Sequence, residues 1–131
     1  MFKKAIIVLT VLSCLMLSID AFAAKIESGV WRQTSSNAGD CPNCIITVKQ
    51  VYDDIIQIEA ARESDATIKW VGFYVYHKDT DEYKGFERWF YQSGPWKDAI
   101  GESILVFEGT TLSKRADYGK NGVLKGTYRK K

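Results

Sequence analysis

The chain of 131 residues is 46% hydrophobic and 26% charged, with ten glycines and two prolines, a composition typical of one ordinary globular domain. Its three cysteines exclude a dense disulfide scaffold, and its single histidine excludes zinc sites that need two or three imidazoles. A formal net charge of +2 gives no electrostatic reason to expect nucleic acid as a partner, because such binding needs clustered Lys and Arg side chains.

The first 23 residues carry the features of a secretory signal peptide. Lys3 and Lys4 form a basic start, residues 5–19 are an almost unbroken apolar run, and residues 21–23 supply small side chains at the two cleavage positions. We expect cleavage after Ala23, a periplasmic or secreted protein, and a single domain over residues 24–131. The apolar run is shorter than the roughly 20 residues that a spanning helix needs, so no membrane span is expected after signal removal.

A lipoprotein signal is the alternative at this end of the chain. Residues 11–14 read Val-Leu-Ser-Cys and resemble the bacterial lipobox, in which the cysteine is lipidated and becomes the new N-terminus. Cleavage before Cys14 would leave a Leu-Met-Leu stretch directly after the lipid, and the apolar stretch before it would be unusually short. Cleavage after Ala23 therefore fits the pattern better.

The remaining sequence predicts an all-β domain. Its segments between turns are rich in Val, Ile, Thr, Tyr, Phe and Trp, and they recur at the spacing of successive strands. Residues 45–58 also fit a helical spacing, but seven of them are Ile or Val, which pack better on a pleated sheet. The expected strands are residues 28–34, 45–51, 55–60, 68–77, 83–92, 103–109, 112–118 and 123–129.

Short connections predict an antiparallel up-and-down meander of these eight strands, because parallel strands need long crossovers. The connections are residues 52–54, 78–82, 109–111 and 120–122, the last containing the Asn-Gly pair favoured in tight hairpins. The longest loop, residues 93–102, has room for a helical turn. Eight strands of this length can close into a small barrel, which removes exposed sheet edges, and a two-sheet β-sandwich is the alternative.

Gly29-Val30-Trp31 at the start of the first strand resembles the Gly-x-Trp that opens lipocalins and related small barrels, the calycin group. The chain without its signal is nearer in length to the avidin-like and fatty-acid-binding members of that group. The resemblance implies that Trp31 closes one end of a barrel whose other end admits a small ligand.

Cys41-Pro42-Asn43-Cys44 is the sharpest motif, since C-x-x-C can be a redox pair, half of a metal site or a local disulfide. The redox interpretation resembles the Cys-Pro-x-Cys of glutaredoxins, but a strand-like run follows, so the helix that would lower the pKa of Cys41 is not expected. Structural zinc would need a second pair of ligands, and His77 is the only imidazole. We therefore expect a disulfide that shapes the loop after the first strand and contributes about 2 kcal/mol of stability.

Two neighbouring strands concentrate aromatic residues. In the strand 68–77, Trp70 and Tyr74 share one face while Phe73 and Val75 share the other, by the two-residue period of a strand. Because neither face is polar, the sequence predicts either an exposed apolar patch or a cover, which the loop 93–102 or a partner would supply.

The strand 83–92 places a charge on each of its faces. Glu87 shares a face with Trp89, and Arg88 shares the opposite face with Phe86 and Phe90. Whichever face points inward, a charged group enters the interior, where it is costly unless it is paired. A ligand of opposite charge or an internal ion pair would compensate it; the alternative is that the charge lies near the strand end and reaches water.

These patterns favour a non-enzymatic exported binding protein that needs no metal or cofactor and holds a small apolar or amphipathic ligand. No nucleophile elbow or Gly-rich phosphate loop is found in the sequence. The alternatives are a protein-interaction or inhibitor module that uses its loops, including Trp96, and a thiol-disulfide oxidoreductase acting through Cys41 and Cys44. The residues expected to contact a small ligand are Trp31, Trp70, Tyr74, Glu87, Arg88 and Trp89.

Overall fold

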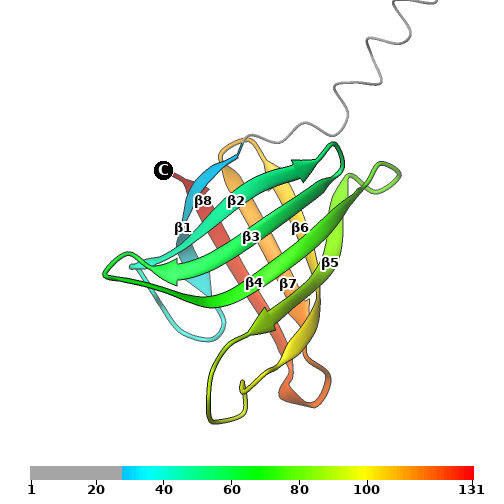
Figure 1. Ribbon diagram of the computed structural model, residues 1–131. Helices are drawn as coiled ribbons and strands as arrows, with labels where there is room; N and C mark the ends of the chain where they lie inside the picture. Colours follow the sequence, from blue (N-terminus) through cyan, green and yellow to red (C-terminus); the bar gives the residue numbers. More distant parts are fainter. Residues whose placement is uncertain (1–27) are drawn as a thin grey trace, which may run out of the picture.

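The computed structural model describes residues 28–131, in which eight antiparallel strands form a closed barrel (Figure 1). Each strand pairs with its neighbours in chain order, and the last strand closes onto the first. The expected signal segment, its cleavage site after Ala23 and Cys14 lie outside the described residues. The strands are β1 (Gly29–Ser36), β2 (Cys44–Tyr52), β3 (Ile55–Arg62), β4 (Asp65–His77), β5 (Glu82–Trp89), β6 (Ile100–Glu108), β7 (Thr111–Asp117) and β8 (Val123–Lys130).

The predicted all-β meander and the closed barrel are confirmed, and the segment whose spacing also fitted a helix forms β2 and β3. Ile46 and Val48 on β2 point into the barrel together with Ile56 and Ile58 on β3, and each is at most 1% exposed. The strand period therefore buries the β-branched side chains of both segments on a single face. Within residues 28–131 there is no helix long and apolar enough to cross a membrane.

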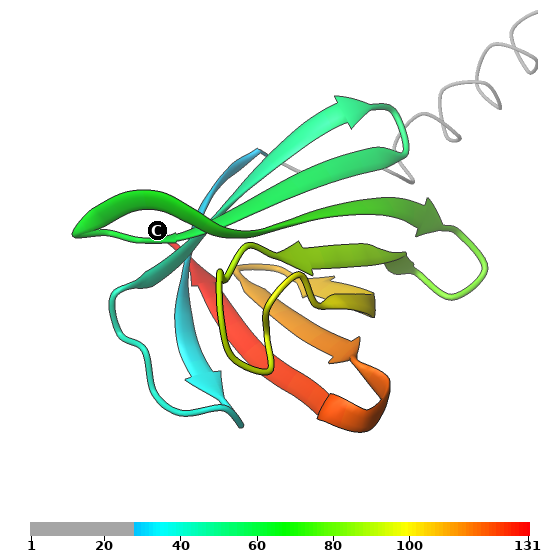
Figure 2. The same ribbon diagram turned by 60° about the horizontal axis from the view of Figure 1, so that its bottom comes forward.

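The two ends of the barrel differ. At one end, close to the start of β1, Trp31 packs edge-on against Phe107 with ring centroids 5.4 Å apart, and Phe107 packs in the same way on Tyr83. At the other end lie the connections formed by residues 37–43, 63–64, 90–99 and 118–122, several of which face the viewer in Figure 2. We call these the packed end and the loop end.

Two connections differ from their predicted form. Asn121-Gly122 does not make a two-residue hairpin turn; a 3-10 turn (η1, Gly119–Asn121) precedes Gly122, and the Tyr118 N–H donates to the Gly122 carbonyl oxygen at 2.9 Å. Gly119 and Gly122 both have positive φ, of 63° and 93°, which allows the chain to reverse over more residues than expected.

The long loop also differs from its predicted extent and place, because β5 ends at Trp89 and β6 already begins at Ile100. It folds as turns joined by a bridge between Tyr91 and Lys97, and Trp96 packs at the loop end. The loop therefore does not cover the outward face of β4. On that face Phe73 is 55% exposed, next to Phe86 on β5, which is 59% exposed.

The hydrophobic core fills the barrel from the packed end towards the loop end. The twelve side chains of its main cluster come from all eight strands, and the largest are aromatic. They are Trp31, Ile46, Val48, Ile56, Ile58, Ala60, Trp70, Tyr74, Tyr83, Leu105, Leu112 and Tyr128.

Candidate functional site

A buried ion pair lies inside the barrel, between the hydrophobic core and the loop end. Glu87 on β5 and Lys114 on β7 are 1% and 6% exposed, and Lys114 Nζ lies 2.8 Å from both carboxylate oxygens of Glu87. The same Nζ lies 4.0 Å from the ring centre of Trp70, so it also makes a cation–π contact. Glu87 is thus the inward charge of its strand, and an internal ion pair compensates it.

Three hydroxyl groups complete this polar cluster. Tyr118 donates to Glu87 Oε1, and the Tyr74 hydroxyl lies 3.2 Å from both Glu87 Oε2 and Ser103 Oγ. Together with Lys114, these groups give both oxygens of the Glu87 carboxylate a hydrogen-bond donor. A buried charge is costly without such partners.

The burial of these groups changes their acid–base behaviour. Burial raises the pKa of Tyr74 and Tyr118 above the usual range, and the negative charge of Glu87 acts in the same direction. Burial lowers the pKa of Lys114, although the neighbouring Glu87 carboxylate opposes that change. The tyrosines therefore stay neutral donors over the physiological pH range.

Two inward glycines make room for the tyrosines of the cluster. A Cβ atom at Gly72 would lie 2.6 Å from the Tyr74 ring, and one at Gly101 would lie 2.7 Å from the Tyr118 ring. Since real Cβ atoms essentially never approach this closely, both glycines are needed where the tyrosine side chains cross the barrel.

A cavity of about 290 Å³ opens at the loop end, above this cluster. A smaller recess of about 90 Å³ shares seven of its lining residues, among them Trp70 and Trp89. The lining combines aromatic rings, the disulfide loop and a few polar groups, which is the usual make-up of a small-molecule site. The lining includes Gln33, Asp40, Cys41, Cys44, Arg62, Trp70, Trp89, Tyr91, Lys114, Lys125 and Tyr128.

Aromatic side chains form one side of this opening. Trp89 stacks on Tyr91 with ring centroids 5.5 Å apart, and its indole lies 6.2 Å from that of Trp70. Trp96 from the long loop packs on Trp89 at 5.7 Å and edge-on against Tyr118 at 4.9 Å. The loop is therefore fixed to the barrel by ring contacts, and these rings hold the side of the cavity in place.

The disulfide loop forms another part of the rim. Cys41 and Cys44 are joined by a disulfide bond with Cα atoms 5.3 Å apart, and both line the cavity. The Asn37 side chain ties the start of this loop to β8: its amide donates to the Val123 carbonyl at 2.9 Å, and its oxygen accepts the Lys125 N–H at 2.9 Å. The disulfide thus shapes a loop at the cavity, as predicted.

The surroundings of the two cysteines favour a structural role for them. β2 begins at Cys44 itself, so Cys41 does not precede a helix whose N-terminus would lower its pKa. Across residues 28–131 no three or more His, Cys, Asp or Glu side chains gather in a way that could hold a metal ion.

Four of the residues expected to contact a ligand lie at or below the cavity. Trp70 and Trp89 line it directly. Tyr74 and Glu87 lie deeper, in the polar cluster under its floor, and both are at most 1% exposed.

The other two expected residues lie away from the cavity. Trp31 is packed at the opposite end of the barrel, and its indole N–H has no hydrogen-bond partner among the described residues. Arg88 is on the outer surface, where its guanidinium lies 3.3 Å from Asp98 Oδ1.

Sequence reasoning missed several polar residues of the site, and Lys114 had a signal that could have revealed it. Lys114 alternates with Leu112 and Ala116 on one face of β7, and the other face is polar throughout. A lysine on the apolar face of a strand marks a buried charge that needs a partner. Arg62 and Tyr128 had no comparable signal, because their place at the cavity depends on how the barrel closes.

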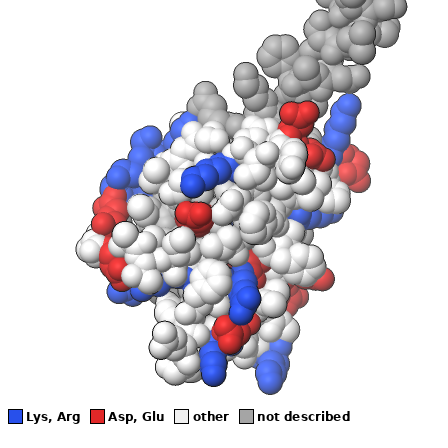
Figure 3. Space-filling model, in the orientation of Figure 1, with Lys and Arg blue, Asp and Glu red and all other residues white. Residues whose placement is uncertain are grey.

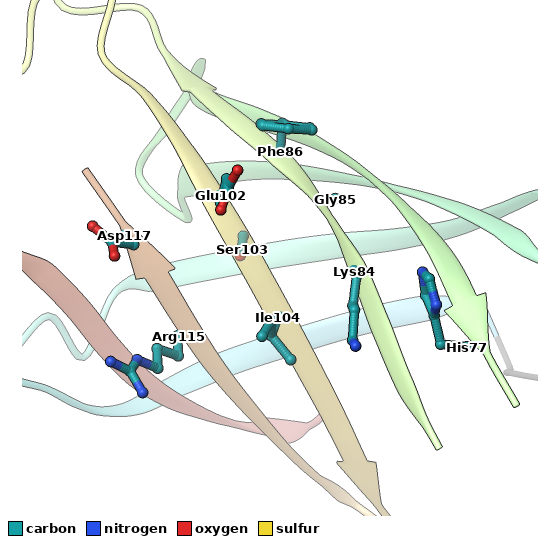
Figure 4. Close-up of a pocket in the computed structure, with 9 residues that line it drawn as sticks. All are labelled: His77, Lys84, Gly85, Phe86, Glu102, Ser103, Ile104, Arg115 and Asp117. Atoms are coloured by element: carbon teal, nitrogen blue, oxygen red, sulfur yellow. The ribbon is translucent and has the colours of Figure 1, made fainter. Parts of the chain in front are cut away.

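A larger hollow, of about 500 Å³, lies on the outer face of β5, β6 and β7. Figure 4 shows that Lys84, Glu102, Arg115 and Asp117 line it together with Phe86. Glu102 and Asp117 lie together at one end of this hollow and Lys84 and Arg115 towards the other, and in Figure 3 both kinds of charge are scattered over a mostly neutral surface. The cavity at the loop end is the better candidate site despite its smaller volume, because buried polar groups converge on it.

The chain matches no protein-family model, no curated protein and no solved structure. Any function must therefore be inferred from the small closed barrel itself and from the geometry of the cavity at its loop end.

Proposed function

We propose that this protein is a non-enzymatic binding protein that takes a small amphipathic molecule into the cavity at its loop end. The observation that carries the proposal is the cavity of about 290 Å³, walled by Trp70, Trp89 and Tyr128, over the buried Lys114. Its volume is near the lower end of the roughly 300–1,000 Å³ of typical ligand pockets, which favours a compact ligand over a long chain.

The packing of Trp31 at the opposite end supports a calycin-like organisation, with one packed end and one ligand-admitting end. The Cys41–Cys44 disulfide supports export, because such bonds persist in oxidising compartments. We therefore propose that the protein acts in the periplasm or outside the cell, after cleavage of its signal. Trp96 packs against Trp89 and Tyr118 and is not a free loop tip, which favours the cavity over a loop-based interaction module.

Two experiments test the proposal. Native mass spectrometry of the exported protein looks for a bound small molecule, and ligand-observed NMR measures whether the protein binds members of a panel of small aromatic amphiphiles. We expect either a noncovalent adduct in the mass spectrum or binding of at least one panel compound to the protein. Tyr91→Ala, which removes a cavity ring, should weaken binding, whereas Phe90→Ala is the matched control, since Phe90 does not line the cavity. The proposal fails if the protein carries no adduct and binds no panel compound, or if Tyr91→Ala and Phe90→Ala bind equally well.

A further inference from the structure

Three polar side chains that line the cavity have no partner among residues 28–131. Tyr128 is only 4% exposed, yet its hydroxyl makes no hydrogen bond with another described residue. Gln33 and Arg62 also line the cavity, and their side chains also lack a partner in this part of the chain. Trp31 Nε1 is the buried side-chain atom without a partner among the described residues, so the Tyr128 hydroxyl is accessible from the cavity and marks a position where a ligand atom would find a free hydrogen-bonding group.

The charges around the cavity favour an anion. Lys114 is already neutralised by Glu87, and Lys69 at the smaller recess pairs with Asp65 at 3.3 Å. Arg62 has no ion pair among the described residues, and it lies exposed at the end of β3, at the rim of the cavity.

Two further charged residues of opposite sign line the cavity, Lys125 and Asp40, so their formal charges sum to zero. With Lys114 paired to Glu87, Arg62 leaves the lining with a formal net charge of +1. A ligand cation would meet the positive charge of Arg62, whereas an anion would be attracted by it.

The depth at which an anion can sit is also restricted. Glu87 lies beneath the cavity and already occupies the Lys114 ammonium, so the floor offers no free cation to a second negative charge. An anionic group therefore fits beside Arg62 and the Tyr128 hydroxyl, while flat aromatic rings remain for the apolar part of the ligand.

Resting on the proposed function, we infer that the ligand is a compact aromatic anion. Its carboxylate or similar acidic group binds Arg62 and Tyr128, and its ring lies against Trp70 and Trp89. The Gln33 amide supplies a further donor.

Three probes with one ring system test the charge preference: naphthalene-2-carboxylate, naphthalene-2-carboxamide and 2-naphthylmethylamine, each titrated by calorimetry at fixed salt. We expect the carboxylate to bind about tenfold more tightly than the carboxamide, and the amine to bind most weakly. Arg62→Gln should remove the advantage of the carboxylate without changing carboxamide binding. Arg88→Gln, which changes an outer-surface arginine, should change neither.

Tyr128→Phe removes only the hydroxyl and should weaken carboxylate binding severalfold, with thermal unfolding as the control for folding. Equal affinities for the three probes, or tightest binding of the amine, would overturn the inference and leave the proposed function standing. A carboxylate preference that persists in Arg62→Gln would also overturn it. If no probe binds at millimolar concentration, the inference fails, and the adduct and panel measurements then decide the proposed function separately.

Discussion

At the scale of single residues, the Glu87–Lys114 pair is the most unusual feature of the barrel. Both groups are almost fully buried, and the pair is completed by tyrosine hydroxyls. A buried pair of this kind adds little net stability, but losing one partner leaves an uncompensated charge in the interior. The pair therefore constrains which sequences the barrel tolerates.

Lys114→Met should lower the free energy of unfolding by about 3–5 kcal/mol, because Glu87 keeps its place in the core without its cation. The double variant Glu87→Gln with Lys114→Met should recover part of that loss, since no charge is then buried. Urea denaturation of the two single variants and the double variant measures the coupling. A Lys114→Met protein as stable as the wild type would contradict the interpretation.

At the scale of elements, β4 and β5 approach one another unusually closely at an inward glycine. A Cβ atom at Gly85 would lie 1.8 Å from the backbone oxygen of Phe73 on β4, which cannot move away as a flexible side chain would. The inward glycines of the barrel thus permit both the strand curvature and the tyrosines of the polar cluster.

Gly85→Ala should destabilise the fold by at least about 3 kcal/mol, because the added methyl group meets backbone. Gly126→Ala on β8 is the matched control. Its added Cβ atom would lie 3.4 Å from its nearest neighbour, the Ser35 backbone oxygen, so the free energy of unfolding should stay within about 1 kcal/mol of the wild-type value. Thermal unfolding of both variants measures the difference. Similar melting temperatures would show that the close approach of β4 and β5 does not constrain the fold.

At the scale of the whole molecule, burial of tyrosines gives the barrel a characteristic dependence on alkaline pH. Burial raises the pKa of Tyr83 to about 12, and the pKa values of Tyr74, Tyr118 and Tyr128 are also raised. In the unfolded chain these groups ionise near pH 10. Above that pH the folded protein binds more protons than the unfolded chain, so its stability falls as the pH rises.

We therefore expect the free energy of unfolding to decrease steeply between about pH 10 and pH 12. The lowered pKa of Lys114 acts in the opposite direction, but only until the unfolded lysine has lost its proton near pH 10.5. A pH titration checks this prediction: tyrosinate absorbance reports the ionisation of the tyrosines, and circular dichroism reports whether the barrel is still folded. The same titration of the urea-unfolded protein is the control. Ionisation of all seven tyrosines near pH 10 in a protein that remains folded would contradict the prediction.

The strands, their antiparallel order and the place of the disulfide loop could be predicted from the amino-acid sequence, whereas closure into a barrel was predicted with a two-sheet β-sandwich as the alternative. Each depends on local information: the two-residue period, the β-branched segments 45–51 and 55–60, and connections too short for parallel crossovers. The alternation along strand β5 also indicated that either Glu87 or Arg88 lies on its inward face.

Which of these two charges is buried, and which residue pairs with it, depends on the tertiary structure. Lys114 lies 27 residues from Glu87 in the chain, and the two meet because strands β5 and β7 face the same interior after closure. The tilt and register of a closed barrel likewise bring Arg62 and Tyr128 to one cavity and leave Trp31 at the far end. Such contacts join distant segments, so no local pattern encodes them.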